Sequence, residues 1–224
     1  MRGSRRHINF ELQSTFNMKK EQDYFRDLVE IRSMMERSSK FLSLSGWAGV
    51  MAGIYALIGS YLAYYVLDFR PEELSDPSAT AILPDNFGQV VLLALVMLIL
   101  AISTAIFLSS KNAIAKGEKA WNATSKRMIY NMAVPLITGG LLILIFISKG
   151  WISWIIPLSL IFYGLSLYNA SKFTFGLLKY LGLIQIGLGL VAACLIEYAV
   201  LLWAIGFGVF HIIYGVYMHI RYER

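Results

Sequence analysis

Long runs of apolar residues without charge constrain this chain more than any other feature of its sequence. A run of about 18 or more such residues can cross a bilayer as a helix. Hydrophobic residues make up 57% of the chain and charged residues only 15%, whereas soluble domains average about 25% charged residues. We therefore predict an all-α, polytopic membrane helical bundle. About six membrane helices are expected, at 41–67, 89–108, 132–147, 151–168, 177–195 and 200–218.

The first forty residues are polar and lack such a run. Residues 1–17 begin with Met-Arg-Gly-Ser and are expected to be an expression-vector leader or a disordered segment. Residues 18–40 are predicted to form a cytosolic amphipathic helix, because apolar side chains recur there at helical spacing. This helix could dock a cytosolic partner, lie on the membrane surface, or extend as a solvated segment packed on the bundle. Residues 219–224 are expected to be a cytosolic tail.

Lysine and arginine are distributed unevenly over the predicted spans. Eighteen of the 20 lie in segments on one side of the membrane, and only Arg70 and Lys149 lie on the other. Because positive residues are retained on the cytoplasmic side, both termini are predicted to be cytoplasmic. The basic side favours contact with anionic lipid headgroups, and no accompanying motif indicates nucleic-acid binding. The basic connector 111–130 is a candidate helical extension and a second candidate surface for a protein partner.

Signatures of enzymes and of metal sites are absent from the sequence. No zinc-protease, nucleophile-elbow, P-loop or dinucleotide-binding motif is present, and the predicted spans hold almost no Asp, Glu, Lys or Arg. The single cysteine, Cys194, cannot form an internal disulfide or a two-cysteine metal site. We therefore expect a non-enzymatic protein with no catalytic residues, no cofactor and no metal.

One polar layer is expected inside the predicted bundle. His211 lies in the sixth span, and an ionisable group at membrane depth indicates a functional site by default. Gln185 and His211 lie thirteen residues to either side of Tyr198, the centre of the last turn. At about 1.5 Å rise per residue, both lie roughly 20 Å from that turn and could form a hydrogen bond. Tyr214, on the same helix face as His211, and Tyr163 complete the candidate site.

Two interpretations of this layer remain open. Interhelical hydrogen bonds in membranes contribute only about 0.6 kcal/mol on average, but they fix which helix faces meet. The layer could therefore only hold the helices together, a role we call structural glue. Alternatively, it could be a proton relay or a ligand site. A metal site is disfavoured because His219 lies two helical turns from His211.

Small residues recur along three of the predicted spans. Such residues let helix backbones approach closely. We expect this to reflect close packing within one chain, with a self-association face and a homo-oligomer as the alternative. The residues are Ser45, Gly49 and Gly53; Gly182, Gly187 and Gly189; Ala204 and Gly208.

Two stretches carry a family resemblance. The first is Ile31–Phe41 (IRSMMERSSKF) leading into Leu44-Ser45-Gly46, and the second is Gly206–Gly215 (GFGVFHIIYG), followed by a final RYER. Together they resemble a family of small, uncharacterised multi-spanning membrane proteins of Bacteroidota-type bacteria. The resemblance covers most of residues 20–224. It implies a bacterial inner-membrane location and no particular activity.

Two classes of function follow from these observations. The first is a non-enzymatic, partner-binding or regulatory membrane protein that uses residues 20–40 and 111–130. The second is a small transporter or channel with a polar path around His211. A cavity that reaches His211 would favour the second class, and a dry, tightly packed bundle would disfavour it.

Overall fold

The computed structural model describes residues 44–71, 85–115, 117 and 121–223. Within these residues it contains helices and no strand, and six helices are long and apolar enough to cross a membrane. This confirms the predicted all-α bundle with the features of a multi-pass membrane protein. The predicted leader 1–17 and amphipathic helix 18–40 lie outside the described residues.

The membrane-length helices follow one another along the chain. The first three are α2 (Gly46–Tyr61) continued by η1 (Leu62–Val66), then α3 (Phe87–Ala115) and α4 (Ala123–Ser148). The fourth consists of η3 (Ile152–Trp154), α5 (Ile155–Ala170) and η4 (Ser171–Phe173), and the fifth is α6 (Leu177–Cys194). The run Ile196–Glu223, called the sixth helix below, consists of η5 (Ile196–Tyr198), α7 (Ala199–Trp203), η6 (Ala204–Phe210), α8 (His211–Met218) and η7 (His219–Glu223).

Several helix ends differ from the predicted spans. The connector 111–130 is largely the end of α3 and the beginning of α4, rather than a separate extension. Asn122 and Ser125 explain the early start of α4, because each side chain accepts a hydrogen bond from the other residue's backbone N–H. This capping box satisfies two backbone donors that a helix start leaves unpaired. Residues His219–Glu223 of the predicted tail 219–224 continue the sixth helix as η7.

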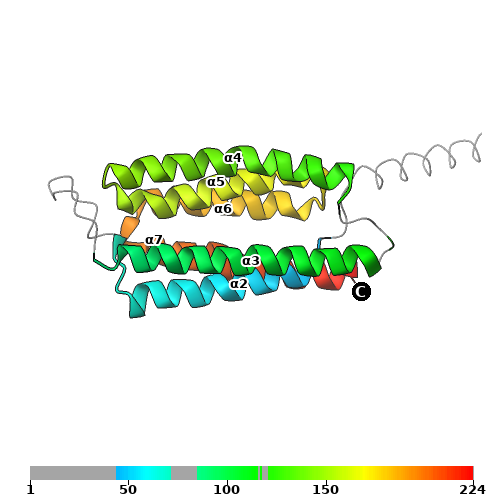
Figure 1. The fold of residues 1–224 in the computed structure, drawn as a ribbon, viewed down its shortest axis with the longest axis horizontal. Helices are drawn as coiled ribbons and strands as arrows, with labels where there is room; N and C mark the ends of the chain where they lie inside the picture. Colours follow the sequence, from blue (N-terminus) through cyan, green and yellow to red (C-terminus); the bar gives the residue numbers. More distant parts are fainter. Residues whose placement is uncertain (1–43, 72–84, 116, 118–120, 224) are drawn as a thin grey trace, which may run out of the picture. The chain divides into compact units, whose positions relative to one another are not determined.

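The helices form two groups (Figure 1). In one group, α2 packs against α3 and along the sixth helix. In the other, α5 packs against both α4 and α6. The sixth helix also touches α5 and α6, and Leu160, Ala192 and Ala199 form an apolar cluster at this contact. The sixth helix therefore joins the two groups.

Glycines allow the closest approaches within each group. A Cβ on Gly182 would lie 2.7 Å from the Gly164 carbonyl oxygen, so α5 and α6 meet there backbone to backbone. A Cβ on Gly53 would lie 2.6 Å from the Gly208 carbonyl oxygen, where α2 crosses the sixth helix. These contacts confirm close packing within one chain. Gly187 differs, because its Cβ would meet nothing within 4 Å, and a self-association face stays a prediction.

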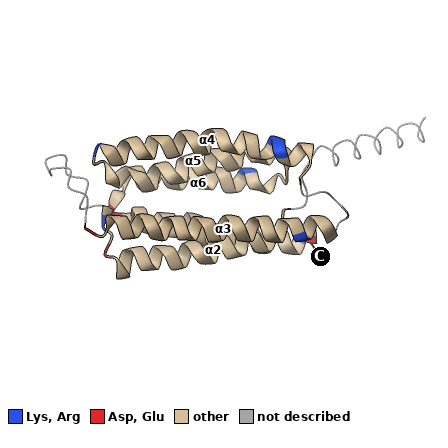
Figure 2. Cartoon of the chain, in the orientation of Figure 1, with Lys and Arg blue, Asp and Glu red and all other residues tan. Residues whose placement is uncertain are grey.

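Charged residues of the described chain lie at the two ends of the bundle, and the middle of the described helices is free of them (Figure 2). The long helix α3 is exposed along most of its length, with large apolar side chains such as Leu92, Ile99 and Phe107 more than half exposed. An apolar band between charged ends is the surface that a bilayer covers.

Candidate functional site

Three helices bring polar side chains together at one level of the bundle. Tyr163 Oη of α5 lies 2.8 Å from His211 Nε2 at the start of α8. Gln185 Nε2 of α6 donates to the Gly206 carbonyl oxygen at 2.8 Å, and His211 Nδ1 lies 3.0 Å from the same oxygen. We call Tyr163, Gln185, His211 and Tyr214 the His211 layer. It lies where the sixth helix meets the second group of helices.

The partners of His211 place a proton on one of its ring nitrogens. A carbonyl oxygen can only accept, so Nδ1 carries the proton and donates to Gly206. In the neutral imidazole Nε2 is then an acceptor, and the Tyr163 hydroxyl donates to it at 2.8 Å. The Gln185 amide nitrogen approaches His211 Nδ1 to 3.4 Å, and both nitrogens point to the Gly206 oxygen. The two side chains meet as the position count predicts, and the Gly206 carbonyl is their shared acceptor.

Two buried atoms of the layer lack a partner. Gln185 is fully buried and His211 is 5% exposed. Among the described residues, neither Gln185 Oε1 nor Tyr214 Oη has a hydrogen-bond partner, although both atoms are buried. More than about 90% of buried backbone groups, and most buried side-chain polar atoms, are paired in folded proteins, and an unmade bond costs about 1–3 kcal/mol. The layer therefore offers an acceptor and a donor to a bound solute or to water.

The sixth helix is widened where it meets the layer. Ala204–Phe210 forms a π-helix that ends at His211, and such turns occur frequently at functional sites. A Cβ on Gly206 would lie 2.6 Å from Gln185 Oε1, so a glycine is needed for the amide to approach. The Phe207 ring stacks on the His211 ring at a centroid distance of 5.7 Å and an angle of 8°. Gln185 thus packs against the backbone of Gly206, and His211 packs against the ring of Phe207.

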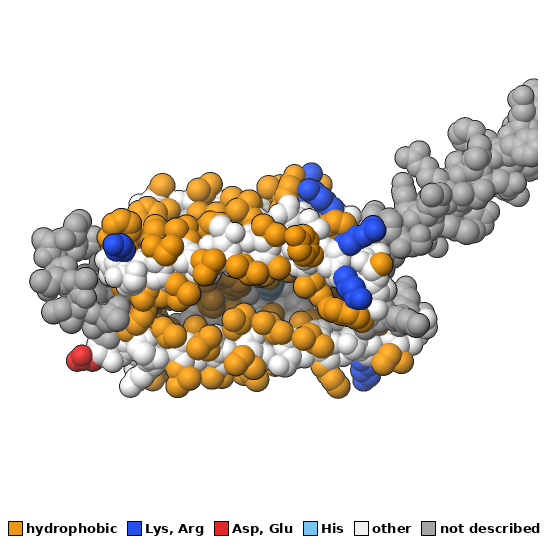
Figure 3. Space-filling view, turned by 45° about the horizontal axis from the view of Figure 1, so that its top comes forward, with side chains coloured by type: hydrophobic (Ala, Val, Ile, Leu, Met, Phe, Trp, Pro, Cys, Tyr) orange, Lys and Arg blue, Asp and Glu red, His pale blue; other side chains and the backbone are white. Residues whose placement is uncertain are grey.

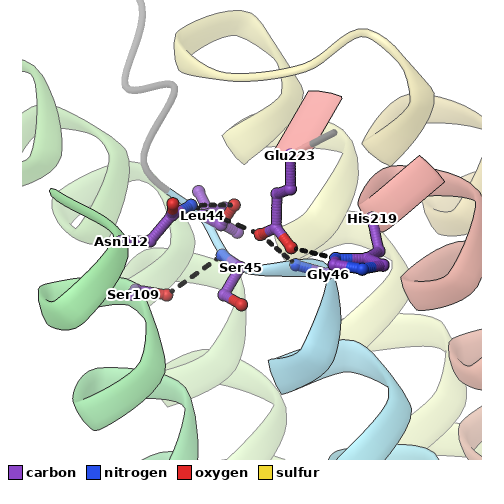
Figure 4. Close-up of polar contacts among 7 residues, drawn as sticks. All are labelled: Leu44, Ser45, Gly46, Ser109, Asn112, His219 and Glu223. Atoms are coloured by element: carbon purple, nitrogen blue, oxygen red, sulfur yellow. Dashed lines mark hydrogen bonds and ion pairs between the residues drawn. The ribbon is translucent and has the colours of Figure 1, made fainter. Parts of the chain in front are cut away.

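A second polar cluster joins the two ends of the described chain (Figure 4). Glu223 Oε1 accepts from the Gly46 backbone N–H at 2.8 Å and from Asn112 Nδ2 at 3.3 Å. Glu223 Oε2 accepts from His219 Nδ1 at 2.7 Å. We call this the end cluster. Its members are Leu44, Ser45, Gly46, Ser109, Asn112, His219 and Glu223.

The end cluster replaces a missing helix cap. The Ser45 side chain makes no capping hydrogen bond to α2. The backbone N–H of Gly46, the first residue of α2, has no acceptor within the helix. The Glu223 carboxylate supplies it from the last turn of the sixth helix, and a negative group is favoured at a helix N-terminus. Sequence reasoning missed this cluster because it assigned residues 219–224 to a tail.

The described part of the chain has a hollow on its surface, and it contains no group of side chains that could hold a metal ion. The space-filling view is hollowed between the two groups of helices, with hydrophobic side chains along both rims (Figure 3). Among the described residues, no group of three or more His, Cys, Asp or Glu side chains could hold a metal ion. The groups of the His211 layer offer hydrogen bonds.

Comparisons of the chain with protein-family models, with curated proteins and with solved structures found no match. The resemblance to a Bacteroidota-type membrane family stays a prediction.

Proposed function

We propose that this protein is a small transporter that binds an uncharged, hydrogen-bonding solute at the His211 layer. The observation that supports the proposal is the pair of buried polar atoms without a partner, Gln185 Oε1 and Tyr214 Oη. A solute hydroxyl can donate to the first or accept from the second. Structural glue accounts for the bonds to Gly206 and His211, but it does not account for these two atoms.

The position of the layer supports the same proposal. Transporter sites lie near the middle of the membrane, between groups of helices that can move against each other. The layer lies where the sixth helix joins the two groups, beside a π-helical segment. The solute is proposed to be uncharged because the charged residues of the described chain lie at the helix ends (Figure 2). A charge moved to this depth would lack a counter-charge.

We further propose a bacterial inner-membrane location with both termini in the cytoplasm. Six described basic residues at one end of the bundle support this orientation: Lys111, Lys126, Arg127, Lys172, Lys179 and Arg221. Partner binding is the second hypothesis. Residues 20–40, one of the two surfaces proposed for it, lie outside the described residues.

Tyr214→Phe separates the transporter proposal from structural glue. It removes a buried hydroxyl without a partner among the described residues, so we expect thermal stability in detergent to be unchanged or slightly higher. Tyr163→Phe is the matched control, because it removes the bond to His211 and should cost about 0.6–1 kcal/mol. If Tyr214→Phe unfolds as easily as Tyr163→Phe, the hydroxyl is structural and the proposal loses its main support.

Water access to the layer tests the proposal directly. Cys194→Ala/Tyr214→Cys, reconstituted in liposomes, should react with a membrane-impermeant methanethiosulfonate, because a transporter must open its site to water. A cysteine at the exposed turn residue Tyr198 is the positive control. If the Tyr214→Cys variant does not react while the Tyr198→Cys variant does, transport is contradicted.

If the labelling shows water access, Tyr214→Phe should slow uptake of the transported hexose, polyol or nucleoside by roughly threefold to tenfold.

A further inference from the structure

Basic side chains gather at one corner of the bundle, where the beginnings of α4 and α6 meet η4. Both helices pack against η4, and Met128, Ala170 and Leu178 form one apolar cluster beneath this corner. The basic residues lie within two positions of members of that cluster along the chain, so their backbones lie at the same corner. We call this set the basic corner: Lys126, Arg127, Lys172 and Lys179.

The positive charge of the basic corner is not balanced by the described residues. All four side chains are exposed, and none takes part in an ion pair within the described chain. Lys126 Nζ lies 5.8 Å from the Trp121 ring, and Lys179 Nζ lies 5.8 Å from the Tyr168 ring. The described carboxylate at this end, Glu223, is occupied in the end cluster.

We propose that the basic corner binds the phosphate of an anionic phospholipid. The corner lies at the end of membrane-length helices, which is the level of the lipid headgroups. Below it, the exposed side chains of Ile129 on α4 and of Tyr180 and Leu183 on α6 provide an apolar surface for acyl chains. Basic groups between membrane helices are the usual recognition element for such headgroups. Figure 3 shows basic side chains gathered at one end of the bundle, next to the hydrophobic side chains of its flank.

Native mass spectrometry of the full chain, released from bilayers of equal phosphatidylglycerol and phosphatidylcholine, tests the proposal. Wild type should retain phosphatidylglycerol preferentially. Lys172→Gln and Arg127→Gln should each lower that preference by about fivefold, because one basic residue near the membrane surface contributes about 1 kcal/mol. Lys149→Gln is the matched control, since it removes the same charge at the opposite end of the bundle.

Three results would overturn the proposal. The two lipids could be retained equally, or Lys149→Gln could reduce retention as much as Lys172→Gln, which would indicate only a general charge effect. Inorganic phosphate at millimolar concentration could also displace the bound lipid, which would identify the corner as a site for free anions. Measured thermal stability of each variant in detergent shows whether a lost lipid reflects lost folding.

Discussion

Gly182→Ala is expected to lower the free energy of unfolding by about 1–3 kcal/mol, the cost of forcing extra volume into a packed interface. The new methyl group would lie 2.7 Å from the Gly164 carbonyl oxygen and 2.8 Å from the Tyr168 backbone nitrogen. Backbone atoms cannot rotate away as a flexible side chain can, so α5 and α6 must separate. This contact holds the second group of helices together.

Gly187→Ala is the matched control on the same helix. Its methyl group would meet nothing within 4 Å, and alanine favours a helix over glycine by about 1 kcal/mol. We therefore expect the two substitutions to change stability with opposite signs. Thermal unfolding in detergent, or unfolding by denaturant in bicelles, measures both. Equal effects at the two positions would show that α5 and α6 are not in backbone contact.

The sequence was sufficient to predict the membrane helices because their signal is local. Each span is a run of apolar residues, and no tertiary contact is needed to recognise it. The ends were harder to predict. Polar residues begin α4, and its start depends on the reciprocal bonds of Asn122 and Ser125. Pro157 lies in the first turn of α5, where proline is tolerated.

The His211 layer was partly predictable for a geometric reason. Two helices joined by a short turn place residues at equal distances from that turn at equal depth, so Gln185 and His211 could be paired by counting. The role of Gly206 could not be found this way, because the π-helical turn shifts the register beside it. The glycines that flank Phe207 were the available signal, since a glycine lets a neighbouring side chain reach the backbone.

The end cluster leads to the second large effect. Glu223→Ala should cost about 1.5–3 kcal/mol, the range measured for hydrogen bonds to charged groups. It removes the acceptor for the Gly46 N–H, for Asn112 and for His219. The backbone N–H of Gly46, at the start of α2, would then lose its hydrogen bond to Glu223. Because α2 packs along the whole sixth helix, loosening this end should also weaken the first group of helices.

Glu197→Ala provides the control for the change in charge. Glu197 is exposed in η5, at the start of the sixth helix, so its loss should leave thermal stability nearly unchanged. Glu223→Gln keeps one acceptor oxygen and should be intermediate between wild type and Glu223→Ala. Hydrogen exchange of the Gly46 amide should accelerate in the same order as stability falls. If Glu223→Ala and Glu197→Ala were equally stable, the carboxylate would not cap α2, and the last turn of the sixth helix would contribute nothing to the bundle.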